Sequence, residues 1–294
     1  MIWLGVSIAL VGALGYAGGA ALQQYEAVHG GANLKLVRRP RWLIGGVIGL
    51  LGASLHAVAL SFAPLVLIQP VSVATLVFAV PLAALLHGRR PHKAEVLGSA
   101  AVAAGLLGLM LLIPQSNTRP VLSTPAALGF LAVIGVVVAV CHLGARRARG
   151  PGKALLLSIG AGSVTASVST FVRVVGGGLG GDLSRLVHWF TAAIPVLLVF
   201  AIVLLQKSYA VGYFGIAYAG VQVVDPITSV LAGTVLLGEP LPTGVGNIVP
   251  ALLSAAVLIA GTITLSRLTP ETTQVAAPPH PELPVPVPTR AAAR

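Results

Sequence analysis

One acidic residue stands inside a long apolar segment of the sequence, where a charged side chain is costly. Asp225 lies near the middle of an apolar stretch over 211–237. A carboxylate at the centre of a membrane helix costs about 2.5–3.5 kcal/mol on insertion scales, so such residues face the bundle interior or a water-filled cavity. We expect Asp225 to bind a cation or a proton, and it is the one residue that we expect to contact a metal ion. The alternative is a neutral Asp225 that hydrogen-bonds a neighbouring helix.

Polar side chains accompany this carboxyl group on the same helix face. Gln222, Asp225 and Ser229 follow 3-4 spacing and therefore share a face, with Thr228 beside them. Pro226 has no N–H and displaces the carbonyl of Gln222 from its helical partner. A broken helix at membrane depth is tolerated where it lines a cavity. Amide, hydroxyl, carbonyl and carboxylate oxygens are ligands that hard cations prefer, so we expect these residues to form a binding site.

A histidine shares a helix face with three glycines in the stretch 42–62. The face consists of Gly45, Gly49, Gly52 and His56. Glycines let a second helix approach closely, so this face is expected to point into the bundle. A histidine there can relay protons, because its unperturbed pKa is about 6.5. The alternative is a neutral imidazole that hydrogen-bonds another helix.

The stretch 64–86 carries a comparable polar group around a proline. Gln69 and Thr75 lie on either side of Pro70, and this proline also frees a helix carbonyl. We expect both polar residues to join the binding site. The alternative is that they hydrogen-bond neighbouring helices without contacting a ligand.

The chain that carries these residues has the composition of a membrane protein. Of its 294 residues, 56% are hydrophobic and 9% are charged, whereas soluble domains carry charge on about 25%. This composition excludes a soluble globular enzyme and a disordered chain. A helix needs about 20 apolar residues to span a bilayer. Nine stretches qualify, namely 2–22, 42–62, 64–86, 94–113, 125–143, 154–175, 189–206, 211–237 and 244–265.

The basic residues predict an orientation. The chain has 18 Lys and Arg against 7 Asp and Glu. With nine spans and an outer N-terminus, all of the bases except Arg119, Arg173 and Arg185 fall in inner loops or the inner tail. The positive-inside rule therefore favours a plasma-membrane protein with a cytoplasmic C-terminus. The charge is explained by topology and contact with anionic lipid, and no nucleic-acid partner is expected.

Two segments resemble each other. Segments 59–91 and 208–242 each contain a short turn, a proline-bearing helix, and then a leucine and a glycine followed by a charged residue and proline. Five spans separate the copies, so the odd number inverts them in the membrane. Inverted repeats are typical of secondary transporters, whose substrate site lies at the repeat interface near the membrane midplane.

These motifs resemble a known superfamily. Phe62-Ala63-Pro64, followed after five residues by Pro70, is similar to the first-half signature of the drug/metabolite transporter (DMT) superfamily. Leu237-Gly238-Glu239-Pro240, with Pro226 before it, resembles the closing turn of EamA-type transporters. Among branches of the superfamily, the NIPA-like magnesium transporters are the most similar, and they also have nine spans. The resemblance implies a transporter fold and a small substrate.

Three positions depart from these patterns. Ala53 stands where NIPA-like proteins carry an acidic residue early in the second span, and Leu55-His56 stands near their following asparagine. Gly88-Arg89 replaces the usual Gly-Glu of the first-half turn. Magnesium is therefore one substrate among several that remain open.

The sequence thus predicts an all-α integral membrane protein of about nine transmembrane helices with an inverted repeat. Residues 1–143 and 144–268 are the expected halves, and 269–294 a Pro-rich disordered cytoplasmic tail. The expected function is secondary transport of a small cation, such as Mg²⁺, or a small metabolite by alternating access. A proton-coupled drug exporter, a membrane-embedded lipid enzyme and an accessory subunit are the alternatives. The lipid bilayer and the transported solute are the expected partners, a homodimer is left open, and neither a cofactor nor enzymatic activity is expected.

Overall fold

The described part of the chain consists of helices. The computed structural model describes residues 2–32, 34–59, 62, 65–112, 121–176, 188–238 and 245–268, and these contain no strand. A 3-10 helix, η1 (Leu34–Arg38), precedes α2. The α-helices are α1 (Ile2–Gly30), α2 (Pro40–Ala59), α3 (Leu65–Leu86), α4 (Lys93–Leu111), α5 (Thr124–Arg147), α6 (Gly150–Gly176), α7 (Trp189–Tyr209), α8 (Phe214–Leu237) and α9 (Val245–Ser266).

Each α-helix corresponds in order to one apolar stretch of the sequence. Seven helices in the described part, α1 and α4 to α9, are long and apolar enough to cross a membrane. The all-helical, multi-pass membrane class is therefore confirmed. The count of nine spans stays a prediction, because α2 is not among these seven helices and α3 contributes only a shorter apolar helix, Ala74–Leu86, over its described portion. The tail over 269–294 and the turn at Ala63 lie outside the described residues.

Several helix ends differ from the predicted spans, and two of the differences have a clear structural cause. α1 continues eight residues beyond position 22, because its last turns pack inside the protein: Glu26 is 6% exposed and pairs with Arg39. α8 begins at Phe214 and not at position 211, because a turn with Gly212 at φ 87° precedes it. Hydropathy measures apolar character alone, so it missed both a polar helix end and a tight turn.

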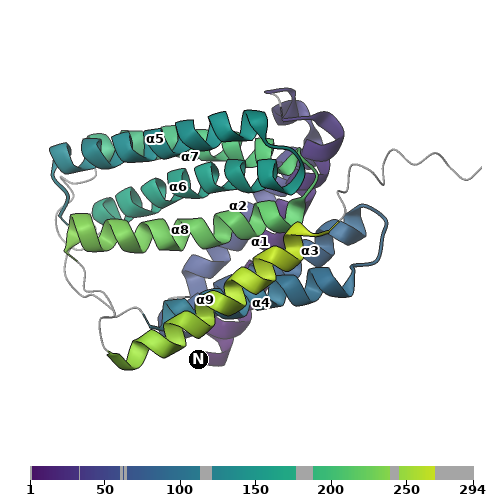
Figure 1. Cartoon of the computed structure of the whole chain (residues 1–294), viewed down its shortest axis with the longest axis horizontal. Helices are drawn as coiled ribbons and strands as arrows, with labels where there is room; N and C mark the ends of the chain where they lie inside the picture. The colour runs from purple at the N-terminus through teal and green to yellow at the C-terminus, as the bar shows by residue number, and fades with distance from the viewer. Residues whose placement is uncertain are drawn as a thin grey trace, which may run out of the picture.

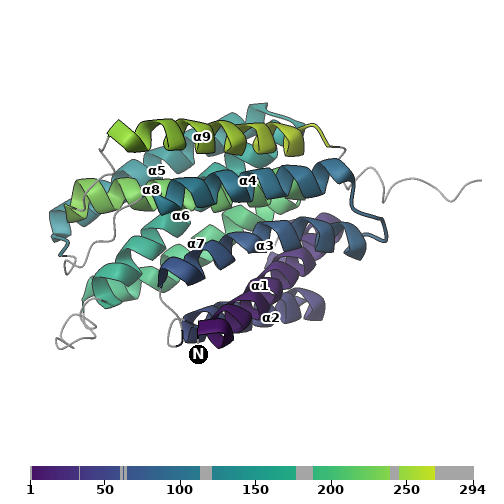
Figure 2. The same ribbon diagram turned by 90° about the horizontal axis from the view of Figure 1, so that it is seen from below.

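The helices pack in recurring pairs. α1 packs along α2 and α3, α6 packs along α7 and α8, and α4 packs along α9. α5 packs on α6. Figure 1 shows α5, α6, α7 and α8 running side by side in one part of the bundle, with α4 and α9 in the other. The view from below shows α1 and α2 together at the opposite side from α9 (Figure 2).

Glycines permit the close contact between α1 and α2. A Cβ on Gly19 would lie 2.5 Å from the carbonyl oxygen of Gly45, and one on Gly52 would lie 2.5 Å from the backbone nitrogen of Tyr16. No real Cβ fits at such distances, so the two backbones touch. The glycine face of α2 therefore points into the bundle, as its spacing predicted. The α4–α9 pair uses the same device, since a Cβ on Gly105 would meet the carbonyl oxygen of Ser254 at 2.5 Å.

The outer helices present apolar side chains to their surroundings. Val133 of α5, Val196 of α7 and Leu252 of α9 are each more than 60% exposed. An exposed apolar surface of this extent is unfavourable in water and is what lipid chains would cover. The exposed residues and the helix lengths together indicate a bilayer as the environment.

A left-handed glycine follows both α3 and α8. Gly88 follows α3 with φ 73°, and Gly238 caps α8 with φ 68°. Both lie in the left-handed region, which glycine adopts without steric cost. After α3 the N–H of Arg89 donates to the carbonyl of Ala84, and after α8 the N–H of Gly238 donates to that of Gly233. Both bonds reach back five residues, as in common helix C-terminal motifs.

The basic residues gather at one end of the bundle, which we call the basic end. It contains the C-terminal ends of α1, α3, α5, α7 and α9 and the N-terminal ends of α2, α4, α6 and α8. The ends of α3 and α9 and the start of α4 lie together at the right of Figure 1. Among the described Lys and Arg residues, only Arg173, in the last turn of α6, lies toward the other end.

Replacing Gly19 with alanine should weaken the α1–α2 contact. The added methyl group meets backbone, which cannot rotate away, and overpacking of this kind costs about 1–3 kcal/mol. We expect Gly19→Ala to lower the thermal unfolding midpoint in detergent. The neighbouring Gly18→Ala is the control, because a Cβ there meets nothing within 4 Å. Gly18→Ala should hold or raise the midpoint, since alanine favours helix; an equal fall in both variants would contradict the packing argument.

Candidate functional site

A cavity of about 390 Å³ lies between the first four helices and α8. It brings together side chains that are far apart in the sequence. α8 contributes the acidic residue and α2 the histidine that the sequence singled out. The lining consists of Gly12, Ala13 and Tyr16 of α1, Gly52, Ala53 and His56 of α2, Thr75 of α3, Leu106 and Met110 of α4, and Gln222, Asp225 and Pro226 of α8.

The polar part of the cavity lies near the middle of the bundle. Asp225 is eleven residues from the start of α8, and Thr75 is eleven residues from the end of α3. At 1.5 Å per residue both lie about 17 Å along their helices from the basic end. A hydrocarbon core is about 30 Å thick. The carboxyl group therefore lies at the depth where a membrane helix is hardest to solvate, and the cavity provides polar surroundings there.

Two serines hydrogen-bond the carboxyl group through the same oxygen. Ser229 Oγ, one turn along α8, donates to Asp225 Oδ1 at 3.2 Å, and Ser169 Oγ of α6 donates to it at 3.4 Å. Among the described residues no hydrogen bond reaches Oδ2. No ion pair neutralises Asp225 in the described part of the chain either. Within the described residues, one oxygen of the carboxyl group thus has both hydrogen bonds, and the other has none and can contact a ligand.

A hydrogen bond joins α8 to α3 beside the carboxyl group. Gln222 Nε2 donates to Thr75 Oγ1 at 2.9 Å, and the Thr75 side chain is 5% exposed. α8 stays helical through Pro226, which cannot donate to the carbonyl of Gln222. Four of the predicted site residues on α8 and α3 therefore lie together, namely Thr75, Gln222, Asp225 and Pro226.

The other predicted residues are placed differently. His56 lines the cavity from α2, and Ser229 contacts Asp225 without being part of the lining. Thr228 is not among the lining residues. Gln69 and Pro70 belong to α3, but their side chains lie outside the described residues.

Tyr16 is a lining residue that the sequence reasoning missed. It comes from the first apolar stretch, which contains no charged residue before Glu26 and so drew no attention. Gly12, Tyr16 and Gly19 follow 4-3 spacing and share a helix face, the same pattern that pointed to His56 on α2. Applying that rule to both helices would have found Tyr16. The phenol adds a hydrogen-bonding group to the α1 side of the cavity.

The lining suits a cation with one positive charge near Asp225. The cation could be an organic one with an apolar body or a metal ion with its hydration shell. Asp225 is the one acid in the lining, and Leu106 and Met110 provide an apolar wall. In the described residues no group of three or more His, Cys, Asp and Glu could hold a metal ion. Among the described lining residues, Asp225 therefore offers a cation a single carboxylate. Six waters occupy about 180 Å³ at liquid density, so a hydrated cation would fit the volume.

The basic end is closed by buried polar contacts. His87 Nε2 donates to Gln24 Oε1 at 3.1 Å, and Gln206 Nε2 of α7 donates to Gln23 Oε1 of α1 at 3.4 Å. Gln24 is 0% exposed and Gln206 is 4% exposed. These contacts join α1 to α3 and to α7 below the cavity. Buried polar side chains are costly unless paired, so the contacts hold this end shut.

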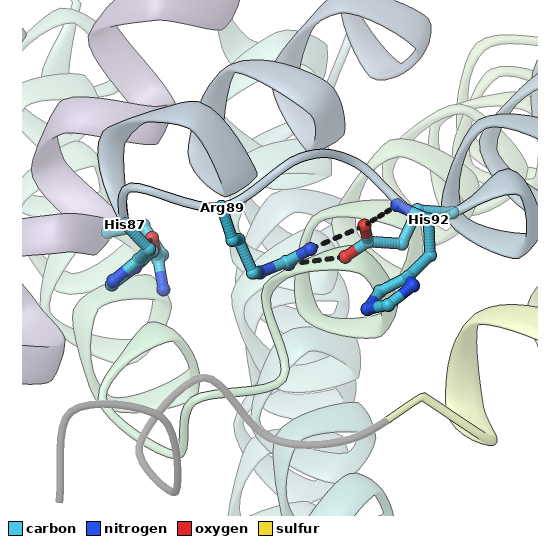
Figure 3. A network of polar contacts seen from close by, with 5 residues as sticks. His87, Arg89 and His92 are labelled. Carbon is cyan, nitrogen blue, oxygen red and sulfur yellow. Dashed lines mark hydrogen bonds and ion pairs between the residues drawn. The ribbon is translucent and has the colours of Figure 1, made fainter. Parts of the chain in front are cut away.

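An ion pair fixes the turn between α3 and α4 at the same end. Both guanidinium nitrogens of Arg89 donate to the Glu95 carboxylate, at 2.7 and 2.5 Å, and the N–H of His92 donates to it at 2.8 Å (Figure 3). Glu95 is 5% exposed. A two-pronged pair of this kind is strong and directional. Arg89, which departs from the superfamily pattern, thus has a defined structural role.

His87 is held neutral at the basic end. Its burial, together with the charges of His29 and Arg89, lowers its pKa from about 6.5 to about 4, and burial is the largest of these causes. The rings of His29 and His87 are stacked with centroids 5.6 Å apart, and Tyr25 contacts both. No hydrogen bond reaches the buried Nδ1 of His87 within the described part. Protonation there would place an unpaired charge beside two other basic groups.

The fold and the cavity define a multi-pass helical membrane protein with an acidic residue in a central cavity. A protein of Corynebacterium glutamicum described as uncharacterized is 24% identical over 247 residues, which cover 80% of this chain and 82% of that protein. No protein-family model matches the chain. No solved structure matches it either.

Cysteine labelling should distinguish the cavity from the packed core of the same helix. In a Cys141→Ala background we expect Ala53→Cys to react with a charged, water-soluble thiol reagent, because Ala53 is exposed and lines the cavity. Ala59→Cys is the control, since Ala59 is 0% exposed on the same helix. Equal labelling of both would mean that α2 does not line a wet cavity. Failure of Ala53→Cys to react would mean that the cavity is dry.

Acid should destabilise the protein partly through His87. A histidine with a folded pKa of about 4 contributes stability that is complete above about pH 6.5 and is lost as the pH falls toward 4. We expect the thermal midpoint to fall less between pH 7 and pH 4.5 in His87→Gln than in wild type. His142→Gln, which removes an exposed histidine, is the control and should follow wild type. Identical pH profiles for wild type and His87→Gln would contradict the burial argument.

Proposed function

We propose that this protein is a secondary membrane transporter of the DMT type that moves a small cation by alternating access, with Asp225 as the cation-binding residue. The observation that carries the proposal is the place of Asp225 in the lining of a mid-depth cavity, with no hydrogen bond to its Oδ2 from the described residues. Acidic residues within membrane helices mark substrate or ion pathways. The carboxyl group has hydroxyl partners and no cationic partner among the described residues, as a site for an exchangeable cation requires.

The packing of the helices supports an inverted repeat. Each helix of the first half corresponds to the helix five places later in the chain. The packed pairs α1–α2 and α1–α3 then correspond to the packed pairs α6–α7 and α6–α8, and α4 corresponds to α9, on which it packs. The same correspondence relates Gly88 after α3 to Gly238 after α8, both left-handed. Five is odd, so nine spans would invert one unit relative to the other. α5 would then connect the two units of four helices.

The proposed binding site lies where the two units meet. Thr75 comes from the first unit and Gln222 from the second, and their hydrogen bond joins α3 to its proposed repeat partner α8. In transporters with inverted repeats the substrate lies at such an interface, where it can be exposed to either side in turn.

The difference between the two ends supports alternating access. The cavity takes its α1 lining from Gly12, Ala13 and Tyr16, while Gln23 and Gln24 of the same helix make the closing contacts toward the basic end. This arrangement corresponds to a carrier that is closed on the basic side. Opening that side would separate Gln23 on α1 from Gln206 on α7, which belong to different proposed units. We assign the basic side to the cytoplasm, because loops rich in Lys and Arg stay there.

Flux measurements in proteoliposomes test the proposal. We expect wild type to carry at least one member of a panel that contains Mg²⁺, monovalent metal ions and small organic cations, with and without a pH gradient. Asp225→Asn should reduce that flux at least tenfold, because the amide keeps the size of the side chain and loses its charge. Thr234→Val is the matched control on α8, since the Thr234 hydroxyl bonds only its own helix, at Val230, at 3.0 Å.

The outcomes separate the alternatives. Flux of Mg²⁺ alone would assign the NIPA-like substrate, and flux of an organic cation driven by a pH gradient would assign a proton-coupled exporter. Equal flux in wild type and Asp225→Asn would exclude the role of Asp225. No flux of any panel member would contradict the cation transporter.

A further inference from the structure

A second cavity, of about 560 Å³, lies at the basic end between the last turn of α5, the first turn of α6 and the last turn of α7. Five of its lining side chains are basic: His142, Arg146, Arg149, Lys153 and Lys207. The first four lie at or near the turn between α5 and α6, and the tertiary structure brings Lys207 to them from α7. No acidic residue is part of the lining.

The charges of this cavity are not neutralised by the described part of the protein. The ion pairs in the described part of the protein are Arg39–Glu26 and Arg89–Glu95. Both lie at the basic end but outside this cavity. The cavity beside the α3–α4 turn offers a contrast, because Glu95 lines it together with its basic residues. Like charges held close together repel one another, so the unneutralised cavity is stabilised by an anion.

The walls of this second cavity are held in a fixed arrangement. Ser208 Oγ of α7 donates to the carbonyl of Ala154 in α6 at 2.8 Å, and both residues are 0% exposed. Lys207 and Lys153, which are next to the bonded residues in the sequence, both line the cavity. α6 also begins at Gly150 inside the cavity, so the positive end of its helix dipole adds to the side-chain charges.

We propose that this cavity binds the phosphate group of an anion, supplied by an anionic phospholipid. Arg side chains match phosphate oxygens in geometry and charge. Basic pockets between helices at the membrane surface bind lipid headgroups. Leu157 and Val211 line the cavity beside the bases, and α5 presents exposed Val136 and Val140 to the surroundings, which gives the acyl chains an apolar surface. A lipid held there would tie the start of α6 to the end of α7.

Thermal unfolding in lipid nanodiscs of defined composition tests this site. Wild type in phosphatidylcholine should be stabilised as phosphatidylglycerol is added, with saturation at a low fraction. For Arg146→Gln/Arg149→Gln we expect the half-saturating fraction to rise about fivefold for each removed charge. Arg90→Gln/Arg147→Gln is the matched control, because it removes the same charge from the basic end and neither residue lines the cavity. A separate arm adds inorganic phosphate to phosphatidylcholine nanodiscs.

The results decide between a site and diffuse attraction. A response to phosphatidylglycerol that is lost in the cavity variant and kept in the control supports the lipid site. If inorganic phosphate stabilises wild type as much as phosphatidylglycerol does, the cavity binds phosphate, and its ligand is the free anion and not a lipid headgroup. Equal losses in cavity and control variants, or no response in wild type, overturn the proposal. The cavity variant should unfold in pure phosphatidylcholine no earlier than wild type, since its repulsion is reduced, and this separates misfolding from lost binding.

Discussion

The cost of placing a carboxyl group at mid-depth in an apolar bundle is the constraint on which the rest of the structure depends. Asp225 is kept there by two serine hydroxyls and a cavity that gives its second oxygen a polar environment. Such a cavity exists only if α1, α2, α3, α4 and α8 surround one volume without collapsing into it. The glycine contacts between α1 and α2 fix one wall, because backbone touching backbone cannot move inward.

The same constraint separates the middle of the protein from its basic end. Near the ends of α1 and α3, polar groups of the basic end are paired with each other, as in Gln24–His87 and Arg89–Glu95, and these pairs need no ligand. In the middle, Asp225 has neither a cationic partner nor a second acid among the described residues. Such pairs stabilise one closed arrangement, whereas a carboxyl group without a cationic partner among the described residues is a place where a cation can bind. The proposed carrier needs both, since a transported ion must be held without permanently bridging the helices.

Much of the site could be predicted from periodicity and the price of burial. Asp225, Gln222 and Pro226 stood out because polar residues and proline are rare in a membrane helix, and His56 because it shared a face with glycines. Tyr16 did not stand out, because aromatic residues are common in apolar stretches. Only the glycines on the same helix face indicate that it points into the bundle. Thr228 was included for its proximity in sequence, but on a helix the adjacent residue points elsewhere. Nothing local indicated that Ser169, from another helix, would reach Asp225.

The sequence by itself determined the class, because composition and hydropathy act residue by residue and need no knowledge of contacts. It also determined which residues share a helix face, since the helical period is fixed by backbone geometry. Only the tertiary structure decided which faces meet. The pairing of Gln222 with Thr75, the contact of α1 with α7 through Gln23 and Gln206, and the place of Lys207 in the basic cavity beside the α5–α6 turn all join residues far apart in the chain. Their energies arise from distance and desolvation, which exist only after the helices have packed.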